Sequence, residues 1–171
     1  MRTVQVCAIC ILASSLTAIA QQGKVPLAPV PIQITTAKKL FISNAGGQSF
    51  ETVFEQIVFN GGPDRPYNDF YAAMKSWGHY ELVSSPADAD LVLAVRWVLS
   101  DTGLKLPVIG DLQVDILDPK SNVTLWSLRE YVRGAVLLGN RDKNFDHAMN
   151  TIVDRTKKLA EPPRASADVA K

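Results

Sequence analysis

The segment Leu91–Leu99 is nearly continuous apolar sequence, interrupted only by Arg96. A strand without clean alternation is usually covered on both faces, so we expect this segment to be the central strand of a sheet. A buried guanidinium needs a partner, because an unpaired buried charge is strongly destabilising. Asp115 or Glu130 on neighbouring strands can supply the carboxylate. The pattern therefore predicts a buried cross-strand ion pair, with an anion-binding floor as the alternative.

Further strands flank this central one. Apolar and polar residues alternate over 112–116 and again over 126–132, and residues 118–122 between them are turn-forming, so the two segments predict a hairpin. The short apolar run 39–43 predicts a first strand, which we expect to lie parallel to the central strand. Residues 80–83 predict another short strand.

Apolar residues recur with helical spacing in three places, and each predicts a helix with one apolar face. The first stripe follows Ser49, the second runs from Pro66 to Gly78, and the third belongs to a long helix whose start Asn140 or Asp142 can cap. Together the elements predict an α+β fold: a mixed, mainly antiparallel sheet of about five strands with helices packed on one face. The stripes are made of Phe50, Val53, Phe54, Ile57 and Val58; Tyr67, Phe70, Tyr71, Met74 and Trp77; and Phe145, Ala148, Met149, Ile152, Thr156 and Leu159.

The first twenty residues have the order of a secretory signal peptide: Arg2, then an apolar stretch, then small residues ending at Ala20. The stretch is too short to favour a permanent membrane anchor. We expect cleavage between Ala20 and Gln21, a periplasmic or secreted location, and no transmembrane segment in the mature chain. Residues 21–35 are rich in proline and predict an extended lead segment, 36–160 a single domain, and 161–171 a disordered tail.

Cleavage would remove both cysteines, Cys7 and Cys10, which excludes disulfides, thiolate metal sites and a cysteine nucleophile in the mature chain. The chain has 18 Lys and Arg against 17 Asp and Glu, and Arg2 leaves with the signal, so the remaining charges balance. Binding of DNA or RNA requires neutralisation of phosphates, and a balanced chain without a long basic run is poorly equipped for it. We therefore expect no nucleic-acid partner.

The sequence also resembles a family. Five segments are similar to those of small bacterial envelope proteins, a broad class that includes the N-terminal domain of TolB and the curli-secretion protein CsgG. The segments are 39–43 (Lys-Leu-Phe-Ile-Ser), 77–83 (Trp-Gly-His-Tyr-Glu-Leu-Val), 87–93 (Ala-Asp-Ala-Asp-Leu-Val-Leu), 112–119 (Leu-Gln-Val-Asp-Ile-Leu-Asp-Pro) and 125–126 (Leu-Trp). The resemblance implies a non-catalytic α+β module that serves assembly or partner binding. The chain lacks the β-propeller of TolB and the apparent membrane hairpins of CsgG, so pore formation is not implied.

Motifs that carry chemistry are sparse. His79 and His147 have no metal-binding spacing, and although His79 with Glu81 could hold a metal, a polar strand start is the preferred interpretation. Asp88 and Asp90 could bind calcium, but we favour a capped turn and a water boundary. No nucleophile elbow or phosphate-binding glycine loop is present in the sequence. We predict no catalytic, cofactor-binding or metal-binding residues, and no cofactor.

Two further interpretations stay open. Asp115 and Glu130 could act as facing carboxylates of a glycosidase-type hydrolase, although Arg129 and Arg133 beside them favour a solvated charged face. The loop 61–66, with Asp64 and Arg65, is a candidate partner-contact loop, with a plain helix connector as the alternative.

We therefore expect an exported binding or assembly module without catalysis, whose partner is another envelope protein. The contact surface would be this loop or an open sheet edge that accepts an added strand. A small carboxylate-dependent hydrolase and a carrier of a small apolar ligand between helices and sheet are the alternatives.

Overall fold

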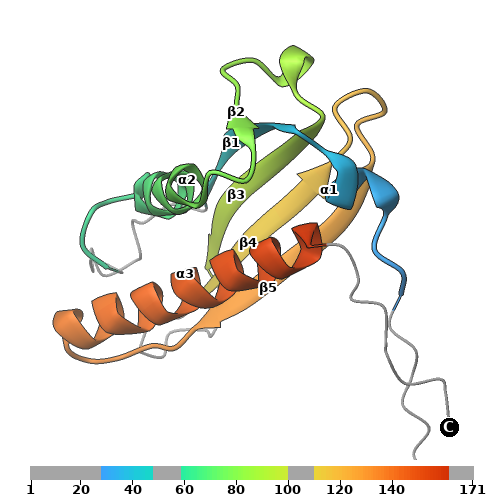
Figure 1. The fold of residues 1–171 in the computed structure, drawn as a ribbon. Helices are drawn as coiled ribbons and strands as arrows, with labels where there is room; N and C mark the ends of the chain where they lie inside the picture. Colours follow the sequence, from blue (N-terminus) through green and yellow to red (C-terminus); the bar gives the residue numbers. More distant parts are fainter. Residues whose placement is uncertain (1–27, 48–58, 100–109, 162–171) are drawn as a thin grey trace, which may run out of the picture.

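The computed structural model describes residues 28–47, 59–99 and 110–161. These residues form one mixed sheet with helices against it (Figure 1), which confirms the predicted α+β fold. The elements in chain order are α1 (Ile32–Thr36), β1 (Lys39–Gly47), α2 (Arg65–Trp77), β2 (Glu81–Leu82), the 3-10 turn η1 (Pro86–Asp88), β3 (Leu91–Leu99), β4 (Gly110–Leu117), β5 (Thr124–Val132) and α3 (Leu138–Ala160).

The predicted central strand, β3, lies in the middle of the sheet, whose strand order is β2-β1-β3-β4-β5. As expected, β1 runs parallel to β3, with Ile42 opposite Leu93. The strands β3, β4 and β5 are antiparallel neighbours, and β4 and β5 form the predicted hairpin. Parallel β2 pairs with β1 at the far edge, so the chain crosses β1 between β2 and β3.

All three described helices cover the same face of the sheet (Figure 1). The space between them and the strands is filled by large buried side chains, among them Trp97 from β3, Phe70 from α2 and Phe145 from α3. The Phe59 ring meets the Trp97 ring edge-on, with 5.2 Å between the ring centroids. The centroid of the Phe145 ring lies 4.3 Å from that of the Phe59 ring. This aromatic contact joins the sheet to α3. The burial of Phe70 and Met74 in α2 and of Phe145 in α3 shows that the apolar stripes predicted for these two helices serve the core.

The opposite face of β3 departs from the expected full burial. Its inward residues are buried, whereas Val92, Ala94, Arg96 and Val98 on the other side are half-buried. None of the described helices packs on that side. We call the side of the sheet away from these helices the open face.

Three local expectations also changed. Residues 32–35, expected to be extended, lie in α1, which starts after Pro31 and anchors itself through buried Ile34. The last helix begins at Leu138 without a side-chain cap, so neither Asn140 nor Asp142 caps it. The second helix ends as predicted, with Gly78 in the left-handed region at φ 65°.

Several sequence predictions lie outside the described residues. These are the signal peptide with its cleavage site at Ala20 and Gln21, the helix after Ser49 and most of the tail. Within the described residues, no helix combines the length and the apolar character needed to cross a bilayer.

Candidate functional site: the open face of the sheet

Strand register places three rows of side chains across the open face. The first row is Phe41, Val92 and Leu117; the second is Ser43, Ala94, Asp115 and Ser127; the third is Arg96, Gln113 and Arg129. The first row is wholly apolar, and the next two are mainly polar. Because side chains alternate between the two sides of a strand, these positions all point away from the buried core.

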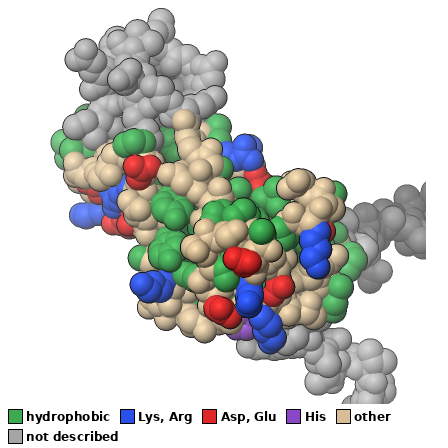
Figure 2. All heavy atoms as spheres, turned by 90° about the horizontal axis from the view of Figure 1, so that it is seen from above, with side chains coloured by type: hydrophobic (Ala, Val, Ile, Leu, Met, Phe, Trp, Pro, Cys, Tyr) green, Lys and Arg blue, Asp and Glu red, His purple; other side chains and the backbone are tan. Residues whose placement is uncertain are grey.

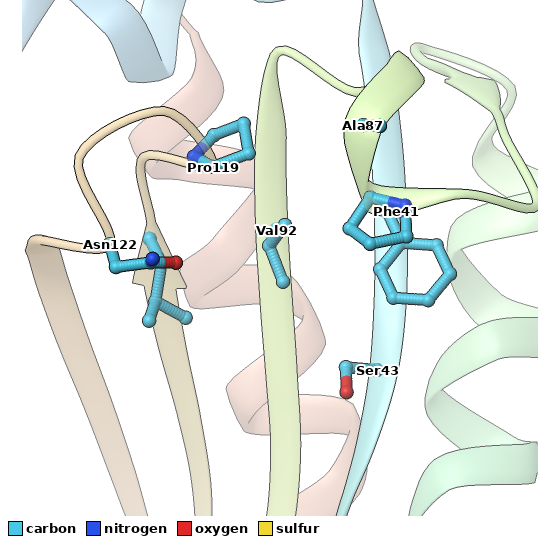
Figure 3. Close-up of a pocket in the computed structure, with 8 residues that line it drawn as sticks. Phe41, Ser43, Ala87, Val92, Pro119 and Asn122 are labelled. Carbon is cyan, nitrogen blue, oxygen red and sulfur yellow. The ribbon is translucent and has the colours of Figure 1, made fainter.

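A hollow of about 430 Å³ opens over the apolar row. Figure 3 shows Phe41, Val92 and Asn122 on the near side of the sheet, with α3 behind it. The walls come from η1 on one side and from the β4–β5 turn on the other, so the hollow is bounded by two connections and floored by three strands. Its lining residues are Phe41, Ser43, Pro86, Ala87, Val92, Leu117, Pro119 and Asn122.

Asp115 is the centre of a polar network beside this hollow. Its carboxylate pairs with Arg96 and accepts hydrogen bonds from Ser127 Oγ at 2.6 Å and Gln113 Nε2 at 3.0 Å. Burial disfavours its ionised form, but the hydrogen bonds from Ser127, Gln113 and Arg96 outweigh burial and lower its pKa. Asp115 is therefore an ionised carboxylate fixed by hydrogen bonds, and it is unsuited to act as a general acid at neutral pH.

The predicted ion pair of Arg96 forms, and its partner is Asp115. The expectation that the Arg96 guanidinium is buried is wrong. The Arg96 side chain is 42% exposed and that of Asp115 is 9% exposed. The pair lies on the open face, where water reaches the arginine, and the network binds the carboxylate from three strands. Its structural consequence is a fixed polar surface next to the apolar hollow.

Glu130 does not join this network. It lies opposite Leu112 in the sheet register, whereas Asp115 lies opposite Ser127, so the two carboxylates point to opposite sides of the sheet. Glu130 accepts instead from Arg155 of α3 at 3.2 Å. The facing carboxylate pair of the hydrolase interpretation is therefore wrong, as is the raised pKa that it required of Asp115.

The loop 61–66 is tied to the body of the protein. The Arg65 guanidinium contacts Asp142 at 2.8 Å, Asp146 at 2.6 Å and Asp69 at 3.1 Å, and its side chain is only 17% exposed. It also lies 4.4 Å from the ring centroid of Phe145. Asp64 accepts from Asn44 Nδ2 at 2.8 Å. Arg65 is thus a structural cross-link, which corrects its assignment as an available partner-contact residue.

The remaining sequence candidates have local structural contacts. Asp90 accepts from the backbone N–H groups of Lys38 and Lys39, at 2.8 and 2.9 Å, and these bonds lower its pKa. Ser85, rather than Asp88, caps η1 by accepting from Ala87 N. His79 stacks on Trp77 at 4.5 Å between ring centroids. Across the described ranges, no cluster of three His, Cys, Asp or Glu side chains could hold a metal ion.

The hollow itself was not predicted, although the sequence carries a signal for it. Phe41, Val92 and Leu117 are apolar residues at the outward positions of strands whose inward positions are already apolar. The predicted carrier site was placed between helices and sheet, whereas this hollow, lined by described residues, lies on the opposite side.

Charged side chains of both signs are interspersed over the face seen in Figure 2, with hydrophobic side chains between them. This surface agrees with the balanced composition of the chain. The face shown therefore has no large area of one charge sign that would steer a charged partner.

No family model matches the chain, and no curated protein matches it. Solved structures do. Protein XCC0632 from Xanthomonas campestris, of the DUF330 family, is 16% identical over 80% of this chain and 89% of that chain, with a TM-score of 0.49. A PelC dodecamer from Paraburkholderia phytofirmans is 12% identical over 78% of this chain and 93% of that chain, with a TM-score of 0.44. A minor lipoprotein from Acinetobacter baumannii is 15% identical over 72% and 89%, with a TM-score of 0.32.

These identities and TM-scores describe distant backbone likeness and do not bear on activity or assembly. The similarity to TolB and CsgG stays a prediction.

Proposed function

We propose that this chain is an exported protein of the bacterial cell envelope that acts as a non-catalytic binding module, with the open face as its docking surface. One observation carries the proposal: an apolar hollow lies on the open face beside a polar network whose charges are already paired. A partner that places apolar side chains in the hollow can do so without stripping water from an isolated charge.

The dimensions of the hollow support this role. A volume of about 430 Å³ can receive one or two large apolar side chains of a partner segment. Ser43 and Asn122 at its border supply hydrogen-bonding groups that can orient the incoming backbone. An apolar centre with a polar border is the usual anatomy of a protein interface.

Export is supported by the N-terminal pattern, in which Arg2 precedes an apolar stretch and small residues up to Ala20. It is also supported by the placement of both cysteines before Ala20. One of the similar structures is named a minor lipoprotein and another is a dodecamer. The proposal takes its support from this chain's own residues, because the likeness to those structures is too distant to transfer a role.

The absence of catalysis is part of the proposal, and the geometry of Asp115 supports it. A general acid or base works best with a pKa near the ambient pH, whereas the hydrogen bonds to Asp115 lower its pKa. Removing Asp115 should therefore affect stability and docking rather than a chemical step.

Site-specific photo-cross-linking in the producing cells tests the docking surface. A photoreactive residue is placed at Ser43 or Asn122, on the border of the hollow, and in matched controls at exposed Lys75 of α2 or Asp154 of α3. The proposal predicts one discrete cross-linked product from both border positions and none from the controls. Equal cross-linking from all four positions, or none from the border, would contradict it.

A further inference from the structure

A second surface stands out at the end of the sheet away from the hollow, in the loop of residues 133–137 that joins β5 to α3 (Figure 1). Val136 is 82% exposed and Leu137 is 67% exposed, the first and third most exposed large apolar side chains in the described residues. Tyr131, at the end of β5, is 49% exposed. Adjacent apolar side chains held this far into solvent are costly unless something covers them.

The loop is held in shape by side chains of α3. Arg141 donates to the carbonyl oxygens of Ala135 and Val136 at 2.8 and 2.9 Å, and Asn144 donates to that of Arg133 at 2.8 Å. The carbonyl of Leu137 accepts from the backbone N–H groups of Asn140 and Arg141. These four carbonyls already have partners within the chain, which lowers the cost of moving them out of water.

Charged side chains of both signs lie around the loop, and Asp111 of β4 is one of them, opposite Tyr131 in the sheet. The basic ones flank the loop itself. Arg133 and Lys143 are exposed, and neither forms an ion pair within the described residues. The nearby carboxylates of Asp142 and Asp146 are directed to Arg65. The first turn of α3 has no acidic residue and no side-chain cap, so its N–H groups add positive potential at the same place.

From these observations we propose that residues 133–137 are a membrane-contacting loop that inserts Val136 and Leu137 into the interface of a bilayer carrying anionic headgroups. Apolar side chains enter the boundary between headgroups and acyl chains, while Arg133, Lys143 and the start of α3 face headgroup phosphates. The inference concerns the end of the sheet away from the hollow, and the contact would leave the hollow free for a partner.

Vesicle flotation tests the proposal with the mature chain, residues 21–171, so that the apolar segment before Ala20 cannot itself bind the vesicles. Vesicles contain either neutral phosphatidylcholine alone or phosphatidylcholine with phosphatidylglycerol. The double variant Val136→Ser/Leu137→Ser should lower the fraction bound to anionic vesicles by about tenfold, because two inserted apolar side chains are lost. Arg133→Gln should lower it about fivefold on anionic vesicles and leave binding to neutral vesicles unchanged.

The matched control is Val123→Ser. Val123 is 55% exposed and lies in the β4–β5 turn, at the opposite end of β5. It should bind vesicles like the parent chain, so that the losses seen with the other variants are assigned to the loop. Equal binding by the parent and the Val136→Ser/Leu137→Ser variant would overturn the proposal.

A fluorescent probe locates the contact independently. An environment-sensitive fluorophore on Val136→Cys should shift to shorter wavelength when anionic vesicles are added, and the same probe on Val123→Cys should not. No shift at position 136 would contradict insertion. A second copy of the chain is the competing occupant, and loss of an oligomer on sizing the Val136→Ser/Leu137→Ser variant, without any loss of vesicle binding, would assign the loop to that contact instead.

Discussion

Arg65 at the start of α2 and Asp142 in α3 are 77 positions apart, yet Arg65 Nη1 lies 2.8 Å from Asp142 Oδ1. The same guanidinium binds Asp146 and Asp69 and lies over the Phe145 ring. Arg65 therefore links α2, the loop before it and α3 through one planar group, which can make several directed hydrogen bonds at once.

Replacing Arg65 with Met should lower the free energy of unfolding by about 2–4 kcal/mol, because the largely buried guanidinium and its partner Asp142 lose their ion pair and hydrogen bonds. Urea denaturation monitored by circular dichroism measures the change. The control is Arg155→Met, which breaks the more exposed pair with Glu130 and should cost at most about 1 kcal/mol. Equal losses for the two variants would show that Arg65 is an ordinary surface residue.

Acid should unfold the protein partly through Asp142. Burial opposes its ionisation, but bonds from Asn60 and Arg65 outweigh it and lower its pKa in the folded state. A lowered folded-state pKa contributes stability above the unfolded value of about 4, and this contribution is lost as the pH falls through the folded value. Asp142→Asn should therefore flatten the fall of unfolding free energy below about pH 4, measured by urea denaturation across pH.

The control for this experiment is Asp154→Asn on the exposed side of α3, since Asp154 forms no ion pair within the described residues. It should keep the parent's pH dependence. If Asp142→Asn keeps it as well, the network around Asp142 does not couple its ionisation to folding.

Asp115 and Glu130 should contribute to stability independently, because they lie on opposite sides of the sheet and have different partners. Asp115→Asn should cost about 1–3 kcal/mol through the loss of charge-assisted hydrogen bonds. In a double-mutant cycle with Glu130→Gln, the two changes should add within about 0.5 kcal/mol. A larger coupling energy would mean that the two carboxylates share a network after all.

Gly110 should not accept a side chain. A Cβ at this position would lie 2.4 Å from Trp97 Cζ2 and 2.6 Å from the Val98 carbonyl oxygen. Because the Trp97 ring is fully buried in the core, Gly110→Ala should destabilise the fold by about 1–3 kcal/mol. Gly139→Ala in α3 is the control: a Cβ there meets nothing within 4 Å, so helix propensity should leave stability unchanged or raise it by up to about 1 kcal/mol. Tolerance of alanine at both positions would contradict the packing around Trp97.

The sheet and the helices α2 and α3 could be predicted because their signals are local. The alternation over 112–116 marks β4, and the stripe from Tyr67 to Trp77 marks α2. Arg65 was misassigned because its partners Asp142 and Asp146 are distant in sequence, and a Gly-Gly-Pro-Asp-Arg segment is typical of an exposed connector. The short helix α1 depends on burial of Ile34, which local propensity around three prolines does not reveal.

The open face could be predicted only in part for a similar reason. The interruption of β3 by Arg96 correctly indicated an ion pair. Which carboxylate faces Arg96 depends on the strand register, because the register places Asp115 and Glu130 on opposite sides of the sheet. The outward apolar residues Phe41, Val92 and Leu117 form a site only when three strands are in register. Their meaning therefore depends on the tertiary structure.

Export is the central claim on which the proposed role depends, and the N-terminal sequence of the protein recovered from fractionated cells tests it most directly. The account predicts that the protein is found in the envelope or secreted fraction and begins at Gln21, immediately after Ala20. Recovery of a chain that begins at Met1 and sediments with the cytosolic proteins would contradict it.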